Sequence, residues 1–310
     1  MELPMRLHPE IARVLDRVPP FDPLADPAAT RAYVRALLAG ARPVEDPRIT
    51  VGPLTVPGPA GDLDVRIYRP TAQGTAPRPC VLYFHGGAFI SGDLDTGDAN
   101  CRDICLAAGA VVVSVDYRPA PEHPYPAAFD DCYAALCWTA ENADALGVDP
   151  ARLAVAGRSA GGALAAAVAL AARDRRGPAL AFQLLLVPAL DDRCDHPSID
   201  ECTDSRIVDG RVARGMWELY LGSAAADQYA APARAQDLAG LPPAYVEICQ
   251  ADALRDEAME YGRRLMTAGV HTELHVVPGA FHLFEGYAPD SRLARRALAN
   301  WTSALTHALA

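Results

Sequence analysis

One strand-turn-helix signal, at residues 153–164, constrains the fold of this chain more than any other stretch. The apolar run from Leu153 to Ala156 predicts a buried strand, and the Ala-rich run after the turn predicts a helix. Between them lies G-R-S-A-G, with Ser159 at its centre. A serine at so tight a turn needs strained backbone geometry and neighbours without bulk, which Gly157 and Gly161 supply. This is the pattern of a nucleophile held at the end of a strand; a plain Gly-rich turn is the alternative.

Length and composition set the broad class. The 310 residues fit one α/β domain with a small accessory part, and the 51% of apolar residues are enough for a large core. Lys plus Arg number 28 against 39 Asp plus Glu, and the net charge of −11 argues against nucleic acid and anionic membranes as partners. The N-terminus lacks the pattern of a secretory signal, and no apolar run reaches membrane-spanning length. We therefore expect a cytoplasmic protein without stable membrane association.

Eight cysteines are scattered along the chain, and none forms a C-x-x-C pair. Several fall in predicted strands or helices, where a free cysteine packs as a small hydrophobic residue. Buried free thiols in a reducing compartment are the expectation, with a disulfide framework or a metal site as the alternatives.

The remaining segments alternate between strands and helices. Residues 1–45 contain two helical patterns, and residues 48–70 read as a hairpin. From residue 80 onward, continuous apolar strands separated by helices predict a parallel sheet covered on both faces. A polar and then aromatic stretch at 190–225 interrupts this rhythm. We expect the core to span 46–189 and 226–310, with the other two segments placed where a lid could form; for the N-terminal pair, simple packing on the core edge is the alternative.

A serine becomes a nucleophile at neutral pH only with a base, a carboxylate that orients the base, and donors for the oxyanion. His282 follows the last predicted strand and is the candidate base, because its place fits the chain order Ser, acid, His. Asp252 directly follows another strand and is the candidate acid, with Asp256 as the alternative. All of these lie after apparent strands, where open α/β sheets place their ligands.

Two turns offer backbone N–H groups for an oxyanion hole. Ala160 follows the candidate nucleophile, and Gly86 and Gly87 follow the strand that ends near residue 84. Two consecutive glycines leave the backbone free to aim N–H groups inward, although a Gly-Gly turn without function is the alternative. His85, beside them, is expected to hold the loop through hydrogen bonds and not to transfer protons.

Five motifs in the right order resemble the hormone-sensitive-lipase-like branch of the α/β-hydrolases, which includes bacterial carboxylesterases for short acyl chains. They are H-G-G-A-F at 85–89, the D-Y-R to P-A-A segment at 116–128, G-R-S-A-G-G at 157–162, D-A-L-R-D-E at 252–257 and the pair Phe281-His282. The resemblance runs from about residue 45 to the C-terminus. It implies the α/β-hydrolase fold, a cap built from the N-terminal helices and the 190–225 insertion, and the following site residues: Ser159, Asp252 and His282 as triad, with Gly86, Gly87 and Ala160 as oxyanion donors.

Two positions depart from the family pattern. Arg158 stands where the family usually has an acidic or small residue, so a charge is reversed beside the nucleophile. It is a candidate for lowering the proton affinity of the triad histidine or for binding an acidic substrate group, and pairing with a nearby carboxylate is the alternative. Pro119 replaces a residue that is commonly aliphatic, and this replacement has no functional explanation.

The expected function is a serine carboxylesterase that hydrolyses short- to medium-chain acyl esters of small molecules without cofactor or metal. Phe89, Trp217 and Tyr220 are candidates for binding the acyl chain, together with Met216, and a purely structural core is the alternative. An amidase or acyltransferase on the same triad is the second expectation. A non-catalytic ligand-binding homologue, as in plant hormone receptors that resemble this branch, is the third, and the complete triad argues against it. The family also makes a homodimer through the edge of the last strand plausible.

Overall fold

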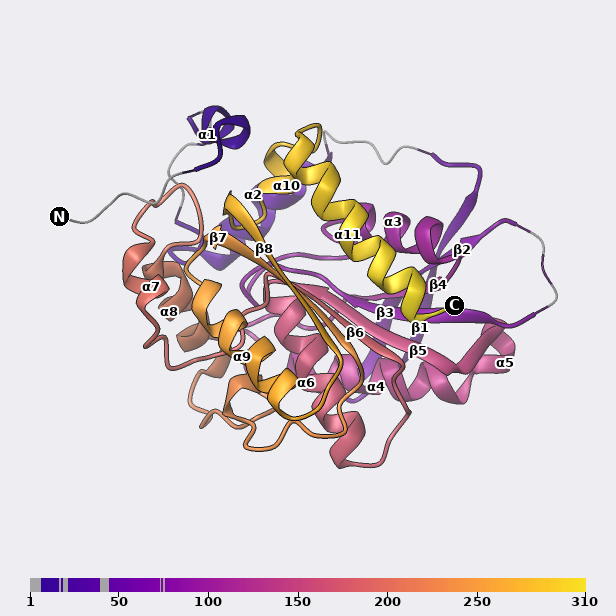
Figure 1. Cartoon of the computed structure of the whole chain (residues 1–310). Coiled ribbons are helices and arrows are strands. Elements are labelled where there is room, and N and C mark those ends of the chain that lie inside the picture. Colours follow the sequence, from indigo (N-terminus) through magenta and orange to yellow (C-terminus); the bar gives the residue numbers. More distant parts are fainter. Residues whose placement is uncertain (1–6, 17, 19–21, 40–44, 73, 75) are drawn as a thin grey trace.

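The fold is built on one eight-stranded sheet, in a computed structural model that describes residues 7–310 except 17, 19–21, 40–44, 73 and 75 (Figure 1). The strands are β1 (Ile49–Gly58), β2 (Gly61–Pro70), β3 (Arg78–Phe84), β4 (Val111–Val115), β5 (Val148–Arg158), β6 (Phe182–Leu186), β7 (Ala244–Ala251) and β8 (Thr272–Phe281). Their order across the sheet is β1-β2-β4-β3-β5-β6-β7-β8. The β1-β2 and β2-β4 pairs are antiparallel, and every later pair is parallel. This confirms the predicted α/β-hydrolase fold, with the 48–70 hairpin at one edge of a mostly parallel sheet.

Burial explains why the central strands read as continuous apolar runs. β4 and β6 are buried at every position, and β3 at all but its first, because helices cover both faces of the sheet there. β1 is mostly exposed and lies at the edge of the sheet, where its two prolines can be accommodated.

Helices form a layer on each face of the sheet. On one face lie α4 (Ala127–Glu141), α6 (Ala160–Asp174) and α9 (Arg255–Thr267), over the larger apolar core. On the other face lie α3 (Asp98–Ala108) and α11 (Arg292–Ala308), as Figure 1 shows. Residues 160–172 of α6 are all buried, and their small side chains let this helix lie close to the sheet.

Seven shorter or peripheral elements complete the described chain. They are α1 (Pro9–Leu15), α2 (Pro27–Ala39), α5 (Ala143–Leu146), α7 (Pro197–Glu201), α8 (Gly210–Leu221), the 3-10 helix η1 (Pro232–Arg234) and α10 (Phe284–Tyr287). The two helical patterns predicted within residues 1–45 correspond to α1 and α2, and the 190–225 insertion contains α7 and α8. In the sequence, Pro19 and Pro20 break the first of these patterns, and both prolines lie outside the described residues.

Two expectations from composition can be compared with the structure. All eight cysteines are free, and all but Cys137 are buried, which confirms the expected buried thiols. Within the described ranges, none of the helices combines the length and apolar character that crossing a bilayer requires.

Candidate active site

The turn between β5 and α6 holds Ser159 in a backbone conformation with φ 57° and ψ −120°. This positive φ is strained for a residue with a Cβ atom. The Ser159 N–H donates to the Leu186 carbonyl oxygen at 2.8 Å and so fixes the turn against β6. A Cβ atom at Gly157 would lie 2.0 Å from the Gly161 carbonyl oxygen, and one at Gly161 would lie 2.0 Å from the Phe84 carbonyl oxygen. Glycine is therefore required on both sides of Ser159, as the motif predicts.

His282 connects Ser159 to Asp252. Its Nε2 atom lies 2.9 Å from Ser159 Oγ, and its Nδ1 atom lies 2.7 Å from Asp252 Oδ2. The three side chains are buried and follow directly on β5, β7 and β8. The Leu254 N–H donates to Asp252 Oδ1 at 3.0 Å, which leaves Oδ2 facing the imidazole. This geometry lets the carboxylate orient the imidazole and the imidazole take the serine proton.

Asp256, the alternative acid, has other partners. Its carboxylate accepts a hydrogen bond from the Ser198 N–H at 2.9 Å and pairs with Arg255 at 2.7 Å. Because these contacts hold the carboxylate at the insertion, the structure selects Asp252 as the partner of His282.

Glu257 lies in the first turn of α9 and supports a loop near the active site, a contact that the sequence does not indicate. Its buried side chain also accepts hydrogen bonds from the N–H groups of Leu190 at 2.6 Å and Asp191 at 3.3 Å. Burial raises the pKa of the Glu257 carboxyl well above its ordinary value. These hydrogen bonds hold the loop after β6. Leu190 in that loop is 67 residues from Glu257 in the sequence, so no local pattern indicates the contact.

The loop after β3 brings backbone N–H groups next to Ser159. A Cβ atom at Gly86 would lie 3.5 Å from Ser159 Cβ, so the two turns are in close contact. Gly87 has φ +136°, and a Cβ atom there would lie 2.0 Å from the Ser91 carbonyl oxygen. For the N–H groups of Gly86, Gly87 and Ala160, the described part of the chain provides no hydrogen-bond acceptor. Free donors grouped around a serine have the arrangement that an oxyanion hole needs.

His85 is held inside this loop. Its Nδ1 atom lies 2.9 Å from the Gly86 carbonyl oxygen, and its ring stacks on Tyr117 with centroids 4.1 Å apart. The Tyr117 hydroxyl donates to the His85 carbonyl oxygen at 2.8 Å. Burial lowers the pKa of His85 to about 4, so the ring is neutral at pH 7. These contacts support the structural role expected for it.

Phe89, Trp217 and Tyr220 meet in one buried aromatic cluster. The Phe89 ring stacks on Tyr220 with centroids 3.9 Å apart, and its centroid lies 5.2 Å from that of Trp217. Trp217 Nε1 and the Tyr220 hydroxyl have no hydrogen-bond partner among the residues that the structure describes. The cluster joins α8 to the loop that contains Gly86 and Gly87.

The N-terminal segment contacts the same loop and the insertion. In α2, Arg31 Nη1 donates to the Ile90 carbonyl oxygen at 2.8 Å. Asp22 pairs with Arg211 of α8 at 2.8 Å. Residues before β1 therefore touch both the loop after β3 and α8, on the side of the sheet edge where Ser159 lies.

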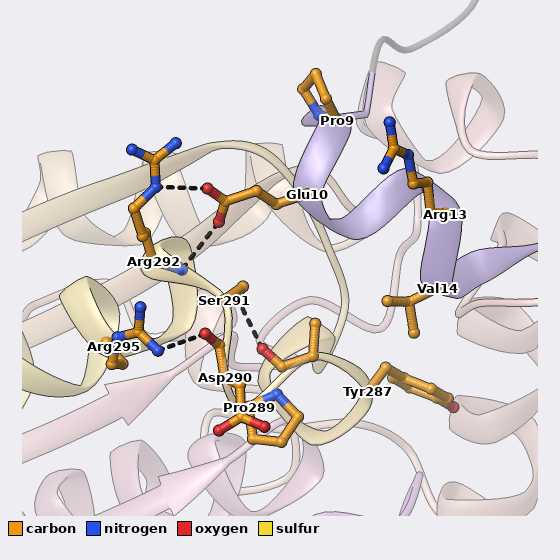
Figure 2. A pocket seen from close by; sticks show the side chains of 11 residues that line it. Pro9, Glu10, Arg13, Val14, Tyr287, Pro289, Asp290, Ser291, Arg292 and Arg295 are labelled. Atoms are coloured by element: carbon orange, nitrogen blue, oxygen red, sulfur yellow. Dashed lines mark hydrogen bonds and ion pairs between the residues drawn. The ribbon is translucent and has the colours of Figure 1, made fainter.

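α1 is anchored to the C-terminal region of the chain. The Glu10 carboxylate accepts a hydrogen bond from the Arg292 backbone N–H at 2.9 Å and pairs with the Arg292 guanidinium at 2.7 Å. Figure 2 shows both contacts. The His8 N–H donates to the Gly279 carbonyl oxygen in β8 at 2.9 Å. A shallow groove of about 620 Å³ separates α1 from α10 and the start of α11 (Figure 2). These contacts place α1 against the segment that carries His282.

Arg158 has a carboxylate partner. Its Nη2 atom lies 3.2 Å from Glu285 Oε1, and the two side chains are only 14% and 15% exposed. The structure thus brings Arg158 into the ion pair stated as its alternative role, and the guanidinium does not lie open to receive an acidic substrate group.

One group of side chains in the described ranges has ligand atoms close enough to hold a metal ion, namely Asp191, Asp195 and His196, within 4.8 Å of one another. Arg193 pairs with Asp191 at 2.6 Å. Because this guanidinium already neutralises the buried carboxylate, we assign no metal to the group.

Comparisons with known proteins agree with this geometry. The family described as α/β hydrolase fold matches residues 81–286. The chain is 43% identical to esterase LipI of Mycobacterium tuberculosis over 286 residues, covering 91% of this chain and 89% of that protein. It is 35% identical to an ethyl acetate hydrolase of Pseudomonas putida over 228 residues, covering 72% and 71%. It superposes on the structure of a bacterial heroin esterase with a TM-score of 0.94 and 36% identity, covering 98% of both chains. With its strand order, its nucleophile turn and these relatives, the chain belongs to the α/β-hydrolase family, in the hormone-sensitive-lipase-like branch.

Proposed function

We propose that this protein is a serine carboxylesterase that hydrolyses short- to medium-chain acyl esters through an acyl-enzyme on Ser159. The observation that carries the proposal is the pair of hydrogen bonds that joins Asp252, His282 and Ser159. Relatives that cover most of the chain are named esterases, and one is named for ethyl acetate, an ester of a short acid. These names support ester hydrolysis as the reaction.

The chemistry follows from the geometry. As Ser159 Oγ attacks the ester carbonyl carbon, His282 Nε2 takes the hydroxyl proton, and Asp252 stabilises the imidazolium that forms. His282 then gives this proton to the leaving alcohol, which leaves the acyl group on Ser159. A water molecule that gives its proton to His282 attacks the acyl carbon, and the acid is released as Ser159 recovers its proton.

We assign the oxyanion of both tetrahedral intermediates to the N–H groups of Gly86, Gly87 and Ala160. Fixed donors at this position stabilise charge that develops only as the reaction proceeds, so they lower the barrier and not only the substrate dissociation constant. The positive φ of Gly87 and the close approach of Gly86 to Ser159 support this assignment.

We assign the acyl pocket to the aromatic cluster of Phe89, Trp217 and Tyr220, closed by a cap of residues 1–45 and 190–225. The contacts of Asp22 and Arg31 with α8 and with the loop after β3 support a cap with two components. The tight stacking of Phe89 on Tyr220 leaves little room for a long chain, which supports a limit on acyl length.

An acyl-chain series tests the function. Wild type and Ser159→Ala are assayed on p-nitrophenyl esters of increasing acyl length, with and without an added alcohol or amine acceptor. We expect wild type to favour short chains and Ser159→Ala to lose at least about 10⁴-fold in kcat. Transfer of the acyl group to the acceptor in preference to water, or cleavage of amides in preference to esters, would instead point to an acyltransferase or amidase. Ester hydrolysis unchanged in Ser159→Ala would overturn the proposal.

We also propose a cytoplasmic location without stable membrane association, and a homodimer through the open edge of β8. β8 is the last strand of the sheet, and Val276 on it is 43% exposed, which supports pairing with a second copy. Light scattering of the purified chain and of Val276→Asp tests the dimer, since a monomeric wild type would contradict it. Fractionation of cells that express the chain tests the location.

A further inference from the structure

Three ionisable side chains lie together beneath the active-site turns, one from each segment that carries a triad residue. Arg158 immediately precedes Ser159, Glu247 lies on the strand that leads to Asp252, and Glu285 is three residues after His282. Glu247 is fully buried, at 0% exposure, and the side chains of Arg158 and Glu285 are 14% and 15% exposed. The reaction as derived above uses none of the three.

Sheet register places two of them at one level. Arg158 is aligned with Leu186 of β6, and Leu186 with Glu247 of β7. Residues that are aligned across neighbouring strands point to the same face of the sheet. Leu186 belongs to the core beneath α3 and α11, so Arg158 and Glu247 project to that face. The Val187 N–H donates to the Glu247 carbonyl oxygen at 2.9 Å, and the Ser159 N–H donates to the Leu186 carbonyl oxygen. These two bonds connect the ends of β5, β6 and β7 beside the active site.

Glu285 reaches the same place from the other side of the active site. It lies in α10, which begins two residues after His282, and its Oε1 atom lies 3.2 Å from Arg158 Nη2. The ion pair therefore connects the turn that holds the nucleophile to the turn that holds its base, across 127 residues of sequence.

The cluster is electrically neutral only if one of its two carboxyl groups is protonated. One guanidinium faces two carboxyl groups, and in the described chain both Glu247 oxygens and Glu285 Oε2 have no hydrogen-bond partner. Burial, followed by repulsion from Glu285, raises the pKa of Glu247 to about 8. At pH 7 Glu247 is therefore protonated, and the Arg158–Glu285 pair is neutral overall. A buried pair that loses one partner leaves an uncompensated charge, so each member should depend on the others.

We propose that Arg158, Glu247 and Glu285 form a positioning cluster that sets the distance between Ser159 Oγ and His282 Nε2, a role that rests on the proposed esterase function. None of the three touches the reacting atoms. Removing Arg158 leaves Glu285 buried without its cation, so α10 and the His282 turn move relative to Ser159. Such a displacement lowers the rate of the chemical step more than it changes substrate binding.

The pH response of the cluster depends on every titratable group that faces it. Besides Arg158 and Glu285, these groups are Tyr245 and Cys249 on β7, Tyr83 on β3, Glu273 and His275 on β8, and Asp103 on α3. The side chains that α11 buries in the core are apolar. When Glu247 loses its proton above about pH 8, the cluster gains a net negative charge, which weakens the hold of Arg158 on Glu285.

The test measures how fast a fluorophosphonate labels Ser159, because this rate reports the Ser159–His282 pair whether or not esters are turned over. Arg158→Met and Glu285→Gln should each slow labelling about ten- to hundredfold in folded protein. The double variant should lose less than the product of the two losses, because it removes both ends of one contact. Arg152→Met is the matched control, since Arg152 pairs with Asp149 at 2.9 Å at the other end of β5, and it should change labelling less than twofold.

Glu247→Gln provides a readout that a merely structural role would not move. Glutamine is neutral at every pH, so the variant should label at nearly the wild-type rate at pH 7 and should lack the wild-type fall above about pH 8. In ester assays run in parallel, Arg158→Met and Glu285→Gln should lose kcat, and their KM should change less than threefold. Should Arg158→Met fail to fold, the Glu247→Gln profile decides alone. The positioning role would be overturned if folded Arg158→Met were labelled at the wild-type rate, or if the labelling rate of Glu247→Gln fell above about pH 8 as it does in wild type. Labelling of wild type without ester turnover would overturn only the esterase function.

Discussion

His282 Nε2 lies 2.9 Å from Ser159 Oγ, although the two residues are 123 positions apart in the chain. The contact exists because β5 and β8 end at the same edge of a parallel sheet, and because Asp252 at the end of β7 holds the imidazole from its other nitrogen. A hydroxyl, a base and a carboxylate in this order make a nucleophile that needs no other group to be activated.

Asp252 fixes the tautomer of the His282 imidazole, and asparagine at position 252 should not hold that tautomer. Asparagine at this position presents an N–H where Asp252 Oδ2 now accepts from His282, so the imidazole turns its proton toward Ser159. We expect Asp252→Asn to lower kcat about 10⁴-fold with little change in KM. Asp256→Asn is the matched control, because that carboxylate contacts Ser198 and Arg255, and it should lose less than tenfold. Steady-state kinetics on one short ester checks both variants. A larger loss of kcat in Asp256→Asn than in Asp252→Asn would show that Asp256, and not Asp252, is the acid of the triad.

Gly87 should tolerate no side chain. Its φ of +136° and the 2.0 Å between a Cβ atom and the Ser91 carbonyl oxygen require the loop to move if alanine is introduced. We expect Gly87→Ala to misplace the oxyanion donors and to lower kcat about 10²- to 10³-fold. Gly52→Ala is the control, because a Cβ atom there meets nothing within 4 Å. Equal kinetics for Gly87→Ala and wild type would remove this loop from the oxyanion hole.

The aromatic cluster makes a prediction about acyl length. Trp217→Ala opens space beside Phe89, so the preferred acyl chain should become longer, at a stability cost of about 3–5 kcal/mol. Tyr220→Phe keeps the ring that stacks on Phe89 and removes a hydroxyl without a partner in the described structure, so its chain-length profile should equal that of wild type. Profiles of kcat/KM over the acyl series distinguish the two variants, and an unchanged profile in Trp217→Ala would leave the cluster as core only.

The sequence predicts the parts of this site that depend on local geometry. Gly157 and Gly161 are needed wherever a serine occupies such a turn, so the elbow is visible as a motif, and the residues after β7 and β8 are placed by the sheet. Contacts between distant segments are different. Glu257 supports Leu190 from 67 residues away, and Glu285 pairs with Arg158 from 127, so neither partner follows from spacing. The one signal available for the cluster is Glu247 itself, a carboxylate between the apolar residues Val246 and Ile248, since a carboxylate is rarely buried without a reason.

Glu247 should also make stability depend on pH in a direction that can be worked out. Its pKa is about 8 in the folded protein, against an ordinary value of 4.5. Between these values the folded state holds a proton that the unfolded state has released, so the free energy of unfolding falls as pH rises through this range and levels off above it. Glu247→Gln cannot titrate and should lack this decline. Urea unfolding at pH 5 and pH 8 checks it, and the variant should gain stability relative to wild type at the higher pH.

Glu260→Gln gives the matched control with the opposite sign. The hydrogen bond from Arg263 lowers the pKa of Glu260, so this carboxylate favours the folded state more as pH rises through its titration range. Replacing it should therefore produce no relative gain between pH 5 and pH 8. If the free energy of unfolding of Glu247→Gln and of Glu260→Gln changed between pH 5 and pH 8 as much as that of wild type, Glu247 would already be ionised in the folded protein. The buried cluster would then carry a net negative charge at neutral pH, contrary to the balance that links Arg158 to Glu285.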